Sequence, residues 1–91
     1  MSKRKRFNDI LEIPKEIYTN IPNFIITGFE DMIIENYKGI LEYEDYYVRV
    51  NTYIGIVNIH GTNLRLEKMT EDNIKIIGKI ESIEIERTID S

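Results

Sequence analysis

The chain contains no alanine, no cysteine and no tryptophan, and it has a single histidine, His60. Without cysteine it forms no disulfide and offers no thiolate nucleophile or thiolate metal ligand. One histidine excludes a multi-histidine zinc site. No apolar run approaches the length of a membrane span, and the basic N-terminus lacks the apolar core of a signal peptide behind it. The missing alanine, the best helix former, disfavours a helical domain.

Isoleucine is the residue that takes alanine's place, with 19 copies among 91 residues. Its branched side chain fits the pleated surface of a strand. Isoleucines also alternate with polar residues, as in Asn73-Ile74-Lys75-Ile76 and Ile83-Glu84-Ile85-Glu86. This period of two places one set of side chains in a core and the other in water. The sequence therefore predicts one small, mainly all-β domain.

Turn residues divide the β region into seven to eight short strands. We expect strands at Phe24–Thr27, Met32–Tyr37, Ile40–Tyr43, Tyr46–Asn51, Ile54–His60, Leu64–Lys68, Ile74–Ile77 and Ile80–Glu86. A strand-after-strand meander of this kind closes as a small barrel, a roll or a sandwich.

The remainder of the chain is expected to flank that β domain, which we place at residues 22–86. Residues 1–6 form a basic tail, and residues 87–91 a frayed C-terminus. Residues 7–21 are expected to hold a short helical segment, because Asn8 or Asp9 can cap a helix that Pro14 ends or continues into a second turn. Ile21-Pro22 then marks the entrance to the β region.

Glycine marks the expected turns, at Gly28, Gly39, Gly61 and Gly78. Three of these follow an Ile-x-Gly pattern, which favours corners of a rolled sheet that need a positive φ or a close backbone approach. The alternative is that glycine simply ends strands. Gly61 is the strongest candidate for a tight corner.

The alternating pattern also predicts which side chains form the core. We expect these to be mainly buried: Ile34, Leu41, Val48, Val50, Ile56, Leu64, Leu66, Ile76, Ile83 and Ile85.

The net charge of −4 hides an uneven distribution. Four of the twelve basic residues are Lys3, Arg4, Lys5 and Arg6, so residues 7–91 hold eight basic and sixteen acidic groups, a net of −8. Such an acidic body disfavours nucleic-acid binding. The basic head is a candidate for contact with an anionic membrane or an acidic partner, the alternative being a solvated tail.

No motif for catalysis is present. His60 lacks a nucleophile motif around it, the acidic turns lack calcium-loop spacing, and no glycine-rich phosphate loop occurs. We therefore expect no catalytic, cofactor-binding or metal-ligating residues. Tyr47 and Arg49 are candidates for a protein interface, because exposed tyrosine and arginine are enriched there.

Four segments, read in order, resemble the YabP/YqfC family of sporulation proteins, and its YqfC branch most. They are Ile21–Gly28, Ile33–Ile40, Ile59–Leu66 and Ile74–Ile80, and upstream Leu11–Glu16 also matches that branch. Each segment is short, but their order and spacing are specific. Tyr37 stands where many members of the family carry histidine.

The resemblance implies a cytoplasmic protein of the mother cell that acts in building the spore envelope, with no catalytic activity. It also implies a membrane-anchored sporulation protein as partner, peripheral to the forespore membrane. A homo-oligomer would stabilise so small a domain. Two other function classes stay open. One is a small β-barrel nucleic-acid module of the Sm-like or OB type, and the other, less favoured, is a carboxylate-dependent enzyme.

Overall fold

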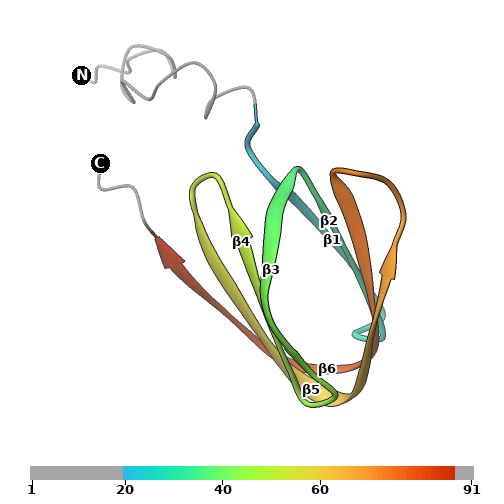
Figure 1. Ribbon diagram of the computed structural model, residues 1–91. Helices are drawn as coiled ribbons and strands as arrows, with labels where there is room; N and C mark the ends of the chain where they lie inside the picture. Colours follow the sequence, from blue (N-terminus) through green and yellow to red (C-terminus); the bar gives the residue numbers. More distant parts are fainter. Residues whose placement is uncertain (1–19, 88–91) are drawn as a thin grey trace, which may run out of the picture.

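All regular structure in the computed structural model, which describes residues 20–87, consists of β-strands. Six strands form one antiparallel sheet in the order β1-β2-β6-β5-β4-β3 (Figure 1). In chain order they are β1 (Asn23–Thr27), β2 (Asp31–Glu35), β3 (Tyr37–Glu44), β4 (Tyr47–Thr52), β5 (Gly55–Lys68) and β6 (Asn73–Arg87). The predicted all-β class is confirmed. The basic tail and most of the expected helical segment lie outside the described residues.

The strand count is six rather than seven to eight, because two expected pairs of strands are each continuous. β5 runs through Gly61 and β6 runs through Gly78, so both glycines lie inside strands rather than between them. Gly39 likewise lies inside β3, and the turn before that strand falls at Asn36, whose φ is 63°. Only Gly28 occupies a turn, between β1 and β2. A glycine that interrupts the alternation can bend a strand without ending it.

The bend in β5 and β6 requires glycine for steric reasons. The β5–β6 register shifts between His60 and Gly61, where the two strands bend together (Figure 1). A Cβ built on Gly61 would lie 2.0 Å from the carbonyl oxygen of Lys79, and Gly78 has a φ of 133°. The expected corners with close backbone approach therefore exist, within long strands.

The bend divides the sheet into two arms. The first arm consists of β1, β2, residues 73–77 of β6 and residues 65–68 of β5. The second arm consists of residues 79–87 of β6, residues 55–62 of β5, β4 and β3. The chain therefore forms a roll, in which both arms contribute to one core.

Backbone hydrogen bonds attach a hairpin turn to each side of the bend. In the β1–β2 turn, the carbonyl of Glu30 accepts from Gly78 N–H at 3.0 Å, and the carbonyl of Phe29 accepts from Ile80 N–H at 2.9 Å. In the β3–β4 turn, the carbonyl of Asp45 accepts from Leu64 N–H at 2.7 Å. These bonds satisfy backbone groups that the bend would otherwise leave unpaired.

The core lies between the arms and is almost wholly aliphatic. Its buried members are Met32, Ile34, Val48, Val50, Val57, Ile59, Leu64, Ile74, Ile76 and Ile80. The expected burial of Ile34, Val48, Val50, Leu64 and Ile76 is confirmed. Ile56, Leu66 and Ile83 are half-buried.

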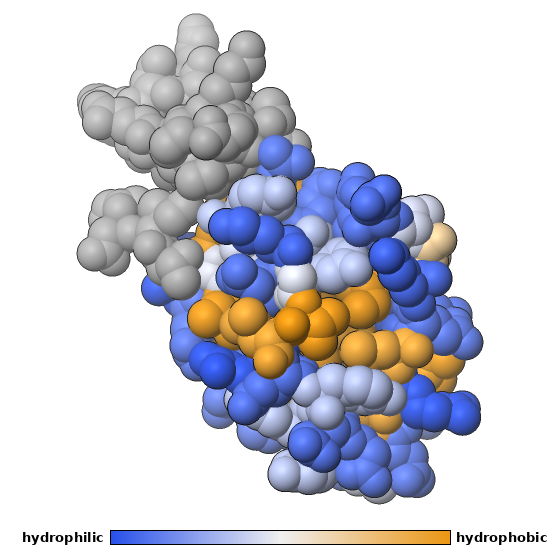
Figure 2. Space-filling view, viewed as in Figure 1, coloured by the Kyte–Doolittle hydropathy of each residue, from blue (hydrophilic) through white to orange (hydrophobic). Residues whose placement is uncertain are grey.

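Two residues predicted to be buried are exposed. Leu41 is 47% exposed because the register of the edge strand β3 shifts between Ile40 and Glu42, and Ile40 packs against the core instead. Ile85 is 60% exposed because it lies beyond the part of β6 that β2 flanks, since β2 pairs only with residues 73–77. Apolar surface consequently remains outside the core. Figure 2 shows a hydrophobic band, bordered by hydrophilic residues, across the face seen in Figure 1.

Candidate functional site

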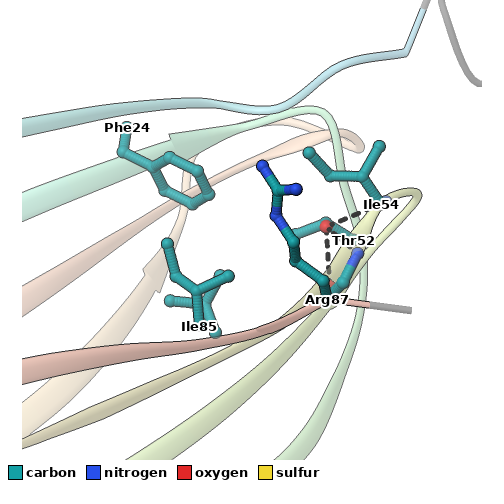
Figure 3. Close-up of a pocket in the computed structure, with 7 residues that line it drawn as sticks. Phe24, Thr52, Ile54, Ile85 and Arg87 are labelled. Atoms are coloured by element: carbon teal, nitrogen blue, oxygen red, sulfur yellow. Dashed lines mark hydrogen bonds between the residues drawn. The ribbon is translucent and has the colours of Figure 1, made fainter. Parts of the chain in front are cut away.

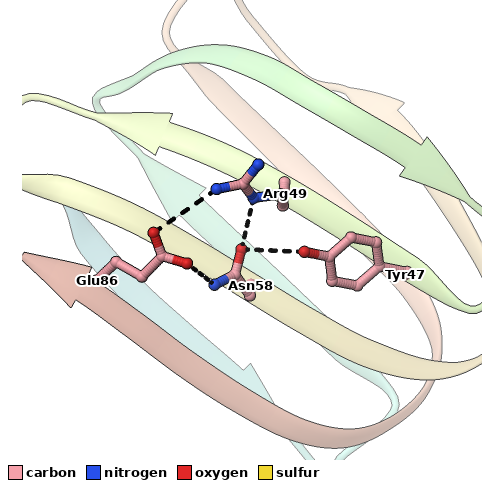
Figure 4. A network of polar contacts seen from close by, with 4 residues as sticks. All are labelled: Tyr47, Arg49, Asn58 and Glu86. Atoms are coloured by element: carbon pink, nitrogen blue, oxygen red, sulfur yellow. Dashed lines mark hydrogen bonds and ion pairs between the residues drawn. The ribbon is translucent and has the colours of Figure 1, made fainter.

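A polar cluster occupies the outer face of the second arm, opposite the core. Tyr47, Arg49, Asn58 and Glu86 converge there from three neighbouring strands (Figure 4). The sheet register explains their convergence, since Arg49 lies opposite Asn58 across the β4–β5 pair. Residues directly opposite in antiparallel strands share a face.

Asn58 is the centre of this cluster and is only 4% exposed. Its Oδ1 accepts from Arg49 Nε at 3.0 Å and from the Tyr47 hydroxyl at 3.4 Å, and its Nδ2 donates to Glu86 Oε2 at 2.8 Å. Arg49 also lies 3.6 Å from Glu86 Oε1, an ion pair that is partly exposed and contributes about 0–1 kcal/mol. The cluster satisfies the buried amide, so its contacts hold the three strands in register.

The two interface candidates on β4 therefore already have intramolecular partners. Tyr47 and Arg49 are half-buried, and both contact Asn58. Sequence reasoning did not identify Asn58 or Glu86. The sequence shows each only as a polar residue at an alternating position of a strand. The register of the strands is needed to show that these positions lie next to each other. The other interface candidates, Lys3, Arg4, Lys5 and Arg6, lie outside the described residues.

Acidic side chains surround this cluster. Glu42 lies opposite Arg49, Glu44 lies opposite Tyr47, and Glu84 lies opposite Asn58. Together with Glu86 they place four carboxylates on this face. Arg49 is the one basic residue that β4 contributes to it. A face of this sign repels the phosphates of nucleic acid.

His60 lies beside this cluster and contacts a ring rather than a carboxylate. The centroids of His60 and Tyr47 are 4.7 Å apart, with their planes tilted by 40°. His60 lines neither of the two cavities that we describe for residues 20–87. Among those same residues, no group of three or more His, Cys, Asp or Glu side chains is placed to hold a metal ion.

One of these cavities opens at the exposed end of the core (Figure 3). It measures about 110 Å³ and is lined by Phe24, Thr52, Ile54, Gly55, Val57, Ile85 and Arg87. The Thr52 hydroxyl is engaged, since it donates to the Gly55 carbonyl at 2.7 Å and accepts from Gly55 N–H at 3.1 Å. Ligand pockets typically measure about 300–1,000 Å³, so this cavity suits a single side chain rather than a cofactor. The other hollow is lined by Asp45, Asn63, Leu64 and Arg65.

The edge strand β1 is the most accessible element of the sheet. All five of its residues are exposed, including Phe24, Ile25 and Ile26. Within residues 20–87, β1 pairs only with β2, so among these residues its other side presents unpaired backbone groups. The chain entry to β1 is fixed, because Asn36 Nδ2 donates to the carbonyl of Ile21 at 3.1 Å.

The second edge strand, β3, differs from β1 in its protection. Two register shifts interrupt its pairing with β4, and its sequence carries Lys38, Glu42 and Glu44. Bulges and charged residues are the devices that prevent edge-to-edge association. β1 contains neither. Alternation along the chain does not indicate which edge is open, because that depends on the order of strands in the sheet.

Comparison with known proteins identifies relatives of the chain. The model of the YabP family matches residues 19–90. An uncharacterized protein of Bacillus subtilis (strain 168), YqfC, is 27% identical over 73 residues, which cover 80% of this chain and 78% of that protein. No solved structure matches.

These matches agree with the resemblance read from the sequence. They are consistent with a sporulation-associated protein, and neither indicates a catalytic activity. Among the described residues, no helix is long and apolar enough to cross a membrane. Since the family model covers most of its length, the chain belongs to the YabP family.

Proposed function

We propose that the protein is a non-catalytic sporulation protein that acts in spore-envelope assembly, through protein–protein association near the forespore membrane. The observation that carries this proposal is the open edge of β1, which is exposed along its whole length and uncharged. An extended segment of a partner can add to such an edge by main-chain hydrogen bonds, while apolar side chains supply further contact area.

The partner we propose is a membrane-anchored sporulation protein, contacted from the cytoplasm of the mother cell. The family resemblance supports this choice of partner. The charge distribution supports an orientation at the membrane in which the basic head lies against anionic lipid and the acidic body remains away from it.

The acidic outer face of the second arm supports a protein partner over a nucleic acid. Binding to a polyanion requires positive surface that replaces counterions, and that face carries four glutamates around Arg49. An apolar, uncharged edge, by contrast, suits the core of a protein interface.

A charge placed on β1 should abolish recruitment in sporulating cells. In Ile25→Lys, the ammonium would lie within the proposed interface and would lose its water on association, so envelope localisation and spore yield should fall together. The matched control is Leu41→Lys on the protected edge β3, since Leu41 is 47% exposed and Ile25 is 45% exposed. Localisation of fluorescent fusions and counts of heat-resistant spores are the measurements. Normal localisation of Ile25→Lys would contradict the proposal.

Neutralising the basic head should weaken membrane-proximal recruitment without unfolding the domain. Replacing Lys3, Arg4, Lys5 and Arg6 with glutamine removes the electrostatic attraction to anionic lipid, which salt screens over about 10 Å at 0.1 M. Co-sedimentation with anionic vesicles should therefore drop at low salt and differ little from the wild type at high salt. Thermal unfolding of the variant serves as the control. A headless protein that localises normally would leave association through β1 as the only mechanism.

A further inference from the structure

The turn between β1 and β2 holds an aromatic residue in an unfavourable conformation. Glu30 N–H donates to the Thr27 carbonyl at 3.0 Å and closes the turn. Both central residues have positive φ, 58° at Gly28 and 62° at Phe29. Glycine adopts this region freely, whereas a bulky residue there is an outlier. Phe29 therefore occupies a position that favours glycine.

Burial of the Phe29 side chain offsets little of this strain. It is 73% exposed, the highest value among the large exposed hydrophobic residues. Its backbone, not its ring, holds the turn in place, through the hydrogen bond that its carbonyl accepts from Ile80 N–H. Strained residues that the surrounding structure holds in place cluster at binding sites. An exposed phenylalanine of this kind is a candidate contact for a partner.

The sequence of β1 is complementary to itself. When two copies pair antiparallel with Ile25 opposite Ile25, each Phe24 lies opposite an Ile26, and each Asn23 lies opposite a Thr27. Apolar residues thus meet apolar residues and polar residues meet polar residues, with no charge in the strand. Aromatic and β-branched pairs of this type stabilise antiparallel sheets.

This pairing also gives Phe29 a position at the interface. The β1–β2 turn of each copy then lies beside the start of β1 in the other copy, at Ile21 and Pro22. The acidic residues that follow Phe29 lie away from the free edge, since Asp31 pairs with Thr27 from β2 and the Glu30 carbonyl accepts from Gly78 N–H of β6. Like charges therefore do not oppose each other across the paired strands.

We propose that β1 pairs antiparallel with β1 of a second copy about Ile25, and that each Phe29 ring packs against the chain entry of the other copy. The sheet becomes continuous across a two-fold axis, as in an isologous dimer. The inference rests on the proposed function of association: in the free protein a second copy occupies the β1 edge, and the membrane-anchored partner would displace it there. Because each body carries a net charge of −8, salt should strengthen the dimer.

Single-cysteine cross-linking of the purified full chain tests the register. The chain has no cysteine, so Ile25→Cys introduces one thiol per copy, and the two thiols meet at the two-fold axis. A short bis-maleimide should convert Ile25→Cys into covalent dimer, whereas the control Leu41→Cys should remain monomeric. Dimer from Leu41→Cys alone would place the contact at β3 and overturn the proposal. So would a wild-type chain that sediments as a monomer at every concentration.

Phe29→Gly separates a binding role for the ring from a structural role. Sedimentation equilibrium should show the dimer dissociation constant raised at least about fivefold, because an aromatic contact is lost. The melting temperature should rise in the monomeric Ile25→Lys background, where association makes no contribution, because the turn is relieved of strain. A lower melting temperature or an unchanged dissociation constant would overturn the role of Phe29.

The failure of this inference is distinguishable from failure of the proposed function. A monomeric purified chain whose recruitment in cells still depends on Ile25 would overturn the dimer and leave association with a different protein. A dimer whose recruitment ignores Ile25→Lys would leave the β1 pairing intact and overturn the proposed function.

Discussion

Gly61→Ala is expected to destabilise the domain by about 3 kcal/mol or more, at or beyond the upper end of the usual cost of overpacking. The new Cβ would lie 2.0 Å from the Lys79 carbonyl oxygen and 2.9 Å from Leu64 Cδ2. A side chain could move away, but Lys79 contributes backbone atoms, so β6 itself would have to shift. That shift would disturb the bend on which both arms depend. For a small domain such a loss is a large part of the total stability.

The matched control for this variant is Gly39→Ala. Gly39 also lies inside a strand, but no atom lies within 4 Å of the position of its Cβ, and its φ is not in the left-handed region. Alanine there should be neutral or stabilising by up to about 1 kcal/mol, since it reduces the freedom of the unfolded chain. Urea unfolding followed by far-UV circular dichroism measures both variants. Equal stabilities for the two would show that Gly61 is not a close-packed corner.

The sequence predicted the class of fold because alternation is a local property. Apolar residues at every second position require a surface with two faces, as Val48 and Val50 show in β4 and Ile74 and Ile76 in β6. The continuity of β5 and β6 was not predictable in the same way. Locally, His60-Gly61 reads as the end of a strand, and only the pairing with β6 beyond the bend keeps the backbone extended.

The candidate surfaces depended still more on contacts between distant residues. Arg49 was identified as an interface residue, yet its environment comes from Asn58 and Glu86, which lie on other strands. Phe29 carried no signal in the alternation, because its importance lies in a positive φ. The exposure of Leu41 and Ile85 likewise follows from a register shift and from where β2 stops pairing.

Ile76→Ala should lower the free energy of unfolding by about 2–5 kcal/mol, from lost burial and the cavity left behind. Ile76 is fully buried and lies between two paired strands, opposite Met32 of β2 and opposite Leu66 of β5. Partners on both sides leave the surrounding side chains little freedom to collapse into the space. The effect should therefore fall in the upper part of the range rather than near the cost of removing a surface methyl group.

The same substitution at Ile85 provides the control, because only the environment differs. Ile85 lies on the same strand and, like Ile76, was predicted to be buried, but it is 60% exposed. Ile85→Ala removes area that is largely in water already and should cost less than about 1 kcal/mol. Denaturant midpoints of the two variants at equal slope give the comparison. A small effect at Ile76 would place the core elsewhere, whereas a large effect at Ile85 would mean that the end of β6 is covered in solution, as by a partner seated at the cavity beside Phe24.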